Sequence, residues 1–142
     1  MKVVFVSSLV SFLVMFVLAG LFNELVINEF VTDNIDSAML LDSPDLAMIT
    51  LGYALLALLM TLIYPRVVSR ASFSVRSGFL FGMVAGIFWL LPYALVLHGS
   101  YRFPSLGLLI DPAWALLEQG IGGAIIGLIY ARFSKPDTSS TF

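Results

Sequence analysis

The segment PAWALLEQGIGGAIIGLIYA, residues Pro112–Ala131, has the length and composition of a membrane-spanning helix. It contains one formal charge, Glu118. About 20 apolar residues in a helix match the ~30 Å hydrocarbon core of a bilayer. Lipid offers no partners to backbone polar groups, so a segment of this kind is expected to be helical.

Three further apolar runs precede this segment, and none contains a charged side chain: Val3–Phe22, Leu46–Tyr64 and Gly78–Leu97. Of the 142 residues, 60% are hydrophobic and only 11% charged, whereas a soluble domain carries roughly 25% charged residues. We therefore predict an all-α membrane protein in which residues 1–133 form one four-helix transmembrane domain. The four helices are expected at about 3–24, 45–65, 77–98 and 112–132.

Basic residues are distributed unevenly along this pattern. Six of the seven fall on one side of the predicted helices: Lys2, Arg66, Arg70, Arg76, Arg132 and Lys135. The loop between the first two helices contains six acids and no Lys or Arg. Short cytoplasmic loops retain Lys and Arg. We therefore expect a multi-pass protein of the inner (plasma) membrane whose N- and C-termini are both cytoplasmic.

The segments outside the predicted helices also carry expectations. Residues 23–44 are predicted as an acidic outer loop that extends the first helix and then lies along the outer interface as an interfacial helix. Asp111-Pro112 and Ser43-Pro44 each resemble an N-cap followed by proline at the first helical position. Residues 134–142 are predicted as a flexible cytoplasmic tail.

The two halves of the chain resemble each other at a constant offset of about 66 residues. Ala19–Phe22 corresponds to Ala85–Phe88, and Leu62–Arg66 corresponds to Leu128–Arg132. Chance similarity between apolar helices is the alternative explanation. A duplication predicts two tandem hairpins forming a parallel repeat about an axis along the membrane normal. It also places Tyr64 and Tyr130 at matching helix ends, where we expect headgroup anchors.

Glycines form a stripe on each of the last two helices. Small residues allow helix backbones to approach closely in lipid, so we expect these two helices to pack together, with an oligomer interface as the alternative. On the fourth helix the glycine face lies opposite the face of Glu118, and neither suits lipid. This favours a homodimer or other membrane-protein subunits as partners, in addition to the bilayer. The glycines are Gly78, Gly82, Gly86, Gly120, Gly123 and Gly127.

Glu118 is the main candidate for a functional site. It is expected roughly 9 Å below the outer boundary, given ~1.5 Å rise per residue from Pro112. An ionisable residue inside a span indicates a functional site by default, although a structural tie between helices is the alternative. Its expected companions at the same level are Asn23, Glu24, Tyr53, Tyr93, His98 and Gln119.

The sequence lacks the residues that several classes of functional site require. The chain has no cysteine and one histidine, so we predict no metal site and no cofactor. It has no P-loop or Rossmann glycine pattern and no basic patch for nucleic acid.

Three stretches resemble small uncharacterised four-helix proteins of the bacterial inner membrane: Gly52–Arg66, Gly78–Tyr93 and Trp114–Arg132. The shared features are a tyrosine and a basic residue ending the second helix, and a glutamate followed by glycines in the fourth. The resemblance implies this fold and compartment, and no activity.

The leading functional expectation is a non-enzymatic component of an oligomer or membrane complex. The alternative is a small proton- or cation-coupled transporter or channel that uses Glu118. A third reading is a membrane enzyme acting on a lipid or quinone, which requires Glu118, Tyr93 and His98 to meet within hydrogen-bond reach.

Overall fold

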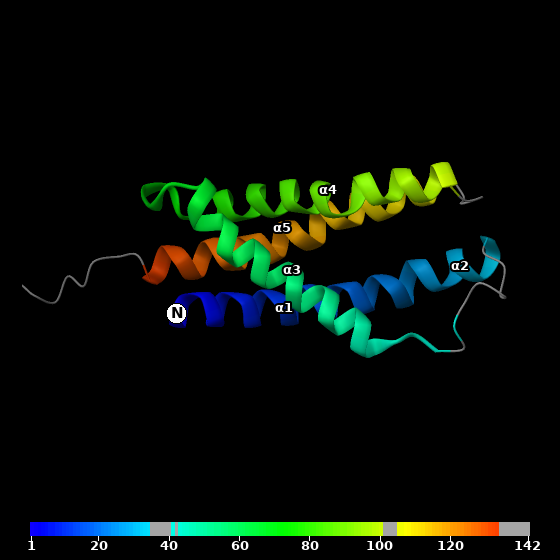
Figure 1. Cartoon of the computed structure of the whole chain (residues 1–142), viewed down its shortest axis with the longest axis horizontal. Coiled ribbons are helices and arrows are strands. Elements are labelled where there is room, and N and C mark those ends of the chain that lie inside the picture. The colour runs from blue at the N-terminus through cyan, green and yellow to red at the C-terminus, as the bar shows by residue number, and fades with distance from the viewer. Residues whose placement is uncertain (35–40, 42, 101–104, 134–142) are drawn as a thin grey trace, which may run out of the picture.

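The computed structural model describes residues 1–34, 41, 43–100 and 105–133. Most of the predicted loop beyond residue 34 and the predicted tail 134–142 lie outside the described residues. The described chain is helical (Figure 1). Its elements are α1 (Lys2–Phe22), a π-helical turn (Asn23–Ile27), α2 (Asn28–Asn34), α3 (Leu46–Val67), a 3-10 turn (Arg70–Ser72), α4 (Val75–Ser100) and α5 (Gly107–Phe133).

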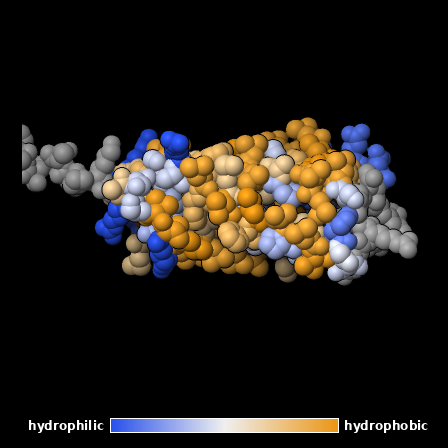
Figure 2. Space-filling view, turned by 90° about the horizontal axis from the view of Figure 1, so that it is seen from above, coloured by the Kyte–Doolittle hydropathy of each residue, from blue (hydrophilic) through white to orange (hydrophobic). Residues whose placement is uncertain are grey.

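In the described part of the chain, four helices are long and apolar enough to cross a membrane. On the face of the bundle that Figure 2 shows, hydrophobic side chains fill the middle and hydrophilic side chains lie at both ends. The prediction of an all-helical protein with four candidate spans is thus confirmed. The spans are Lys2–Val31, Leu46–Val67, Val75–Ser100 and Gly107–Phe133.

The helix starts differ from the prediction in two places. Asp45, not Ser43, is the N-cap of α3, and its Oδ1 accepts hydrogen bonds from the amides of Ala47 (3.0 Å) and Met48 (3.1 Å). α5 begins at Gly107, so Asp111 and Pro112 lie inside it and Asp111 is no cap. The predicted caps Ser43 and Asp111 are therefore wrong. α3 begins after the Asp45 cap, and α5 begins at a turn formed by Ser105 and Leu106.

The predicted extension of the first helix is confirmed as far as it is described. The chain passes from α1 through the π-helical turn into α2 and remains helical to Asn34. α2 therefore continues α1 beyond the other helices at one end of the bundle (Figure 1).

α4 and α5 pack side by side along their lengths (Figure 1). A Cβ atom at Gly78 would overlap the carbonyl oxygen of Gly123, and one at Gly82 would overlap that of Gln119. A Cβ at Gly86 would lie 2.6 Å from the carbonyl oxygen of Ala115. The two helices therefore touch backbone to backbone, as the glycine stripes predicted.

α1 covers the next side of α5. The Ser11 hydroxyl donates to the carbonyl oxygen of Gly122 at 3.0 Å, and Met15 is fully buried against Gly122. Ser7, one turn earlier, is also fully buried. Serine and glycine thus bring α1 close to α5, a role for the serines that the sequence did not indicate.

α3 crosses the bundle obliquely, passing from α4 at one end to α1 at the other (Figure 1). Tyr64 and Tyr130 are 0% and 9% exposed, with ring centroids 5.6 Å apart. The Tyr130 hydroxyl donates to the Thr61 carbonyl at 2.9 Å, and the Tyr64 hydroxyl lies 2.8 Å from Ser77 Oγ. The prediction that these tyrosines are headgroup anchors is therefore wrong; they belong to the core.

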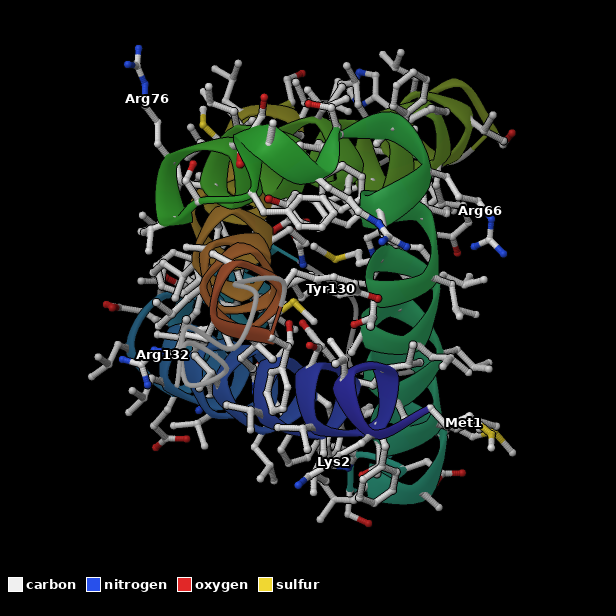
Figure 3. All side chains as sticks on the ribbon, turned by 90° about the vertical axis from the view of Figure 1, so that its left-hand side faces the viewer. Met1, Lys2, Arg66, Arg76, Tyr130 and Arg132 are labelled. Atoms are coloured by element: carbon white, nitrogen blue, oxygen red, sulfur yellow. The ribbon has the colours of Figure 1, made fainter. Side chains whose placement is uncertain are left out.

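We name the two ends of the bundle by their charges. At the basic end, the labelled side chains Lys2, Arg66, Arg76 and Arg132 spread around the rim while Tyr130 points inward (Figure 3). At the opposite, acidic end lie exposed acids: Glu24, Glu29, Asp33 and Asp45.

Both unusual faces of α5 are covered within one chain. α4 covers the glycine face, while α1 and α3 cover the face that carries Glu118. Both faces are covered without a partner protein, because the tilt of α3 and the close approach of α1 complete the enclosure, and the homodimer or other subunits stay a prediction.

Candidate functional site

Glu118 lies deep inside the bundle. Its side chain is 2% exposed. It follows Gly107 by eleven residues, which places it roughly 16 Å along the axis of α5 at ~1.5 Å per residue. This is deeper than the sequence predicted, because α5 begins a turn and a half before Pro112. Glu118 is thus an acidic group near the middle of a candidate span.

Three side chains donate hydrogen bonds to the Glu118 carboxyl group. Trp114 Nε1 reaches Oε2 at 2.8 Å, and Gln119 Nε2 reaches Oε1 at 2.7 Å. The Tyr53 hydroxyl of α3 donates to Oε2 at a longer 3.4 Å. Trp114 is one helical turn before Glu118 on the same face of α5. Three donors suit the ionised form, which accepts hydrogen bonds and donates none.

Phenylalanines of α1 hold two of these donors in place. The Phe22 ring stacks on Trp114 with centroids 4.5 Å apart and an interplanar angle of 4°. Phe16 meets Tyr53 edge-on at 6.1 Å. Since such ring pairs have preferred geometries, these contacts orient the side chains of Trp114 and Tyr53. α1 thus supports the site through the donors, which themselves come from α5 and α3.

A pocket of about 480 Å³ leads to Glu118. Its wall comes from α1, the π-helical turn, α3, α4 and α5. Ile49 of α3 and Trp89 of α4 line it and are 39% and 51% exposed, so the pocket reaches the outside of the bundle between these helices. The residues that line it are Phe16, Ala19, Gly20, Phe22, Asn23, Ile27, Pro44, Leu46, Ile49, Tyr53, Trp89, Leu90, Asp111, Trp114, Ala115, Glu118 and Gln119.

The charge of the pocket has one sign. Asp111 and Glu118 line it, and no basic side chain is found among the described residues of its wall. The two acids are seven residues apart on α5, so they lie on one face about two turns, or roughly 10 Å, apart. Asp111 lies nearer the acidic end and Glu118 deeper. This wall attracts cations and repels anions.

The structure brings together some of the predicted site residues and separates others. Asn23, Tyr53 and Gln119 line the pocket with Glu118. The other three do not line it: Glu24 is exposed on the π-helical turn, Tyr93 is 60% exposed on α4, and His98 lies at the end of α4.

Two polar residues of the site were missed. Asp111 was assigned to helix capping, although its spacing of seven from Glu118 could have placed it on the same face. Trp114 is four residues before Glu118, a spacing that puts the two side chains on one face of the helix and could have indicated this hydrogen bond. The aromatic residues from other helices, Phe16, Phe22 and Trp89, had no signal in the sequence, because helix crossing brings them there.

Within the described residues, no group of three or more His, Cys, Asp or Glu side chains could hold a metal ion. No protein-family model, curated protein or solved structure matches the chain.

Proposed function

We propose that the protein is a small proton- or cation-coupled transporter or channel of the plasma membrane, with Glu118 as the cation site. One observation carries this: the pocket of about 480 Å³ reaches a buried carboxylate that is held by donors and faces no basic side chain among the described residues lining the pocket. An acidic group in a span is costly, and such groups mark ion or substrate pathways. A purely structural glutamate would need no pocket.

The charged ends of the bundle support the orientation that we propose. Five basic residues lie at or next to the basic end: Lys2, Arg66, Arg70, Arg76 and Arg132. By the positive-inside rule this end faces the cytoplasm. The pocket then opens in the outer half of the membrane, below the acidic end. Exposed acids around that end would raise the local concentration of cations.

The contact between Tyr64 and Tyr130 supports the proposed duplication. The two tyrosines occupy equivalent positions of the two hairpins, and their rings meet at 5.6 Å. An axis of approximate two-fold symmetry along the membrane normal would bring equivalent side chains together in this way. At the position of Glu118 the other copy has Gly52, around which a Cβ atom would meet nothing within 4 Å. The carboxylate site therefore belongs to one hairpin only.

The enzyme reading has little support. It requires Tyr93 and His98 near Glu118, whereas the donors to Glu118 are Trp114, Tyr53 and Gln119. Self-association and other subunits remain a proposal, and native mass spectrometry from mild detergent would report them. They need a surface other than the faces of α5, such as the exposed apolar side of α4 at Leu80, Val84 and Phe88.

The transport proposal is tested in proteoliposomes that contain the purified protein. We expect sodium, potassium or proton flux above that of empty vesicles, and we expect Glu118→Gln to abolish it while the helical circular dichroism spectrum is retained. Glu24→Gln is the matched control, because Glu24 is an exposed acid that does not line the pocket. Equal flux in the wild type and Glu118→Gln would refute the role of Glu118.

A further inference from the structure

Some hydrogen-bond acceptor positions in the pocket have no donor. Oε1 of Glu118 accepts one hydrogen bond, whereas Oε2 accepts two, and a carboxylate has about four acceptor positions. Oε1 of Gln119 also has no partner, but it is buried beside Gly86 of α4 and is not open to the pocket. The Asp111 carboxyl group also lines the space. A molecule that complements these groups must bring a positive charge or hydrogen-bond donors.

The remaining wall is apolar and rich in aromatic rings. Phe16, Phe22, Tyr53, Trp89 and Trp114 all line the pocket. Aromatic faces attract cations, and aromatic cages recognise quaternary ammonium groups. A volume of about 480 Å³ falls in the range of roughly 300–1,000 Å³ for small-molecule sites. This volume is far larger than the volume of a bare metal ion.

Divalent metal cations do not suit the wall. Ca²⁺ takes about six to eight oxygen ligands, and the described residues offer no cluster of three acidic or histidine side chains. The two carboxylates on α5 lie about two turns apart, too far for both to bind one small ion. Ile49 and Trp89, both exposed, border the opening between α3 and α4, so an apolar ligand can reach the site from the lipid side.

We infer that the pocket binds a monovalent organic cation, a substituted ammonium whose charged group lies beside Glu118 and whose apolar body lies among the aromatic rings. This inference rests on the proposed function and names its substrate class. The charge supplies the counterion that Glu118 lacks among the described lining residues, and the rings replace the lipid or water around the apolar body.

Intrinsic fluorescence gives a direct test, because the chain has two tryptophans and both line the pocket. The probe is benzyltrimethylammonium, compared with neopentylbenzene, its uncharged isostere, on the detergent-solubilised wild-type protein. We expect saturable changes in tryptophan emission with the ammonium compound and at least about tenfold weaker binding of the neutral one, which corresponds to roughly 1.4 kcal/mol. Equal binding of the two compounds would overturn the inference without any variant.

Two variants sharpen the test. Glu118→Gln should weaken ammonium binding by about tenfold or more, and Glu24→Gln should leave it unchanged. Should Glu118→Gln fail to fold, Asp111→Asn replaces it, with a smaller loss of affinity expected. Flux of sodium or protons that depends on Glu118, without any ammonium binding, would overturn this inference and leave the proposed function standing. Loss of both would overturn both.

Discussion

The Glu118 carboxylate is stabilised in an apolar environment by neighbours that replace water. Two of its three donors, Trp114 and Gln119, come from the same helix and approach to 2.8 and 2.7 Å. The third, Tyr53, comes from α3. A buried charge without such partners is strongly disfavoured. The site is therefore built mainly by α5 and completed by α3.

The donors should differ in strength, since hydrogen bonds weaken with distance. Trp114→Phe removes a 2.8 Å bond and Tyr53→Phe a 3.4 Å bond, while each leaves an aromatic ring in place. We expect Trp114→Phe to lower the free energy of unfolding in detergent by about 1–2 kcal/mol and Tyr53→Phe by less, about 0.6 kcal/mol.

The control for these variants is Trp89→Phe. Trp89 lines the same pocket but is 51% exposed and is not a donor to Glu118. The Trp89→Phe substitution should leave the free energy of unfolding nearly unchanged. A larger loss of stability for Tyr53→Phe than for Trp114→Phe would contradict the arrangement of donors described here.

At the scale of elements, the contact between α4 and α5 is the most closely packed part of the bundle. Its glycines face backbone atoms of the partner helix, which cannot move aside as a flexible side chain can. We expect Gly82→Ala to destabilise the protein by about 1–3 kcal/mol, because the added methyl group forces the helices apart. Thermal or denaturant unfolding in detergent measures this loss.

Two further glycines provide a graded comparison. At Gly122 an added Cβ would meet the flexible Met15 side chain at 2.5 Å, so Gly122→Ala should cost less than Gly82→Ala. At Gly52 nothing lies within 4 Å, so Gly52→Ala should be neutral or stabilising by up to about 1 kcal/mol through helix propensity. The reverse order of stabilities would be inconsistent with the described packing.

The sequence predicted the elements better than their contacts. Apolar runs and small-residue stripes were sufficient for the four helices and for the pairing of α4 with α5, because both follow from local composition. The burial of Tyr64 and Tyr130 could not be predicted, since it depends on the tilt of α3. Glu118 and Gln119 could be predicted to share a site because they are neighbours in the sequence. Tyr53 lies on another helix, so its place beside them had to be predicted from its estimated depth in the membrane.

In the whole molecule, α1 packs against both α5 and α3, and α4 packs against α5, while α3 has few contacts with α4 and α5. Toward the basic end the pocket is followed by a core that includes Met15, Met60, Tyr64 and Tyr130. Passage of a cation past this core needs a second arrangement of the helices. The part of α3 that precedes Leu56 contains no buried residue and borders the pocket, so it is the part of this helix that is freer to move.

This role of α3 predicts the effect of a crosslink. The chain lacks cysteine, so Ile49→Cys and Trp89→Cys can be joined by a flexible bis-maleimide across the pocket opening. We expect the joined protein to lose cation flux in proteoliposomes, because α3 can no longer move away from α4. Each single cysteine variant treated in the same way is the control, and undiminished flux in the joined protein would exclude this motion.

The proposed orientation of the whole chain is tested by labelling single cysteines in intact spheroplasts with a membrane-impermeant maleimide. Glu29→Cys at the acidic end should react at once, and Ala71→Cys at the basic end only after permeabilisation. Both positions are exposed in the structure, so accessibility within the protein is matched. Labelling of Ala71→Cys alone in intact spheroplasts would reverse the orientation.

We propose that a cation meets the carboxylate of Glu118 inside the bundle. Infrared difference spectroscopy of the reconstituted protein tests it most directly, by comparing carboxyl bands before and after addition of sodium, potassium or benzyltrimethylammonium chloride. We predict a change in a carboxyl band that is present in the wild type and in Glu24→Gln and absent in Glu118→Gln. An unchanged wild-type spectrum with all three salts, or the same change in Glu118→Gln, would contradict the claim.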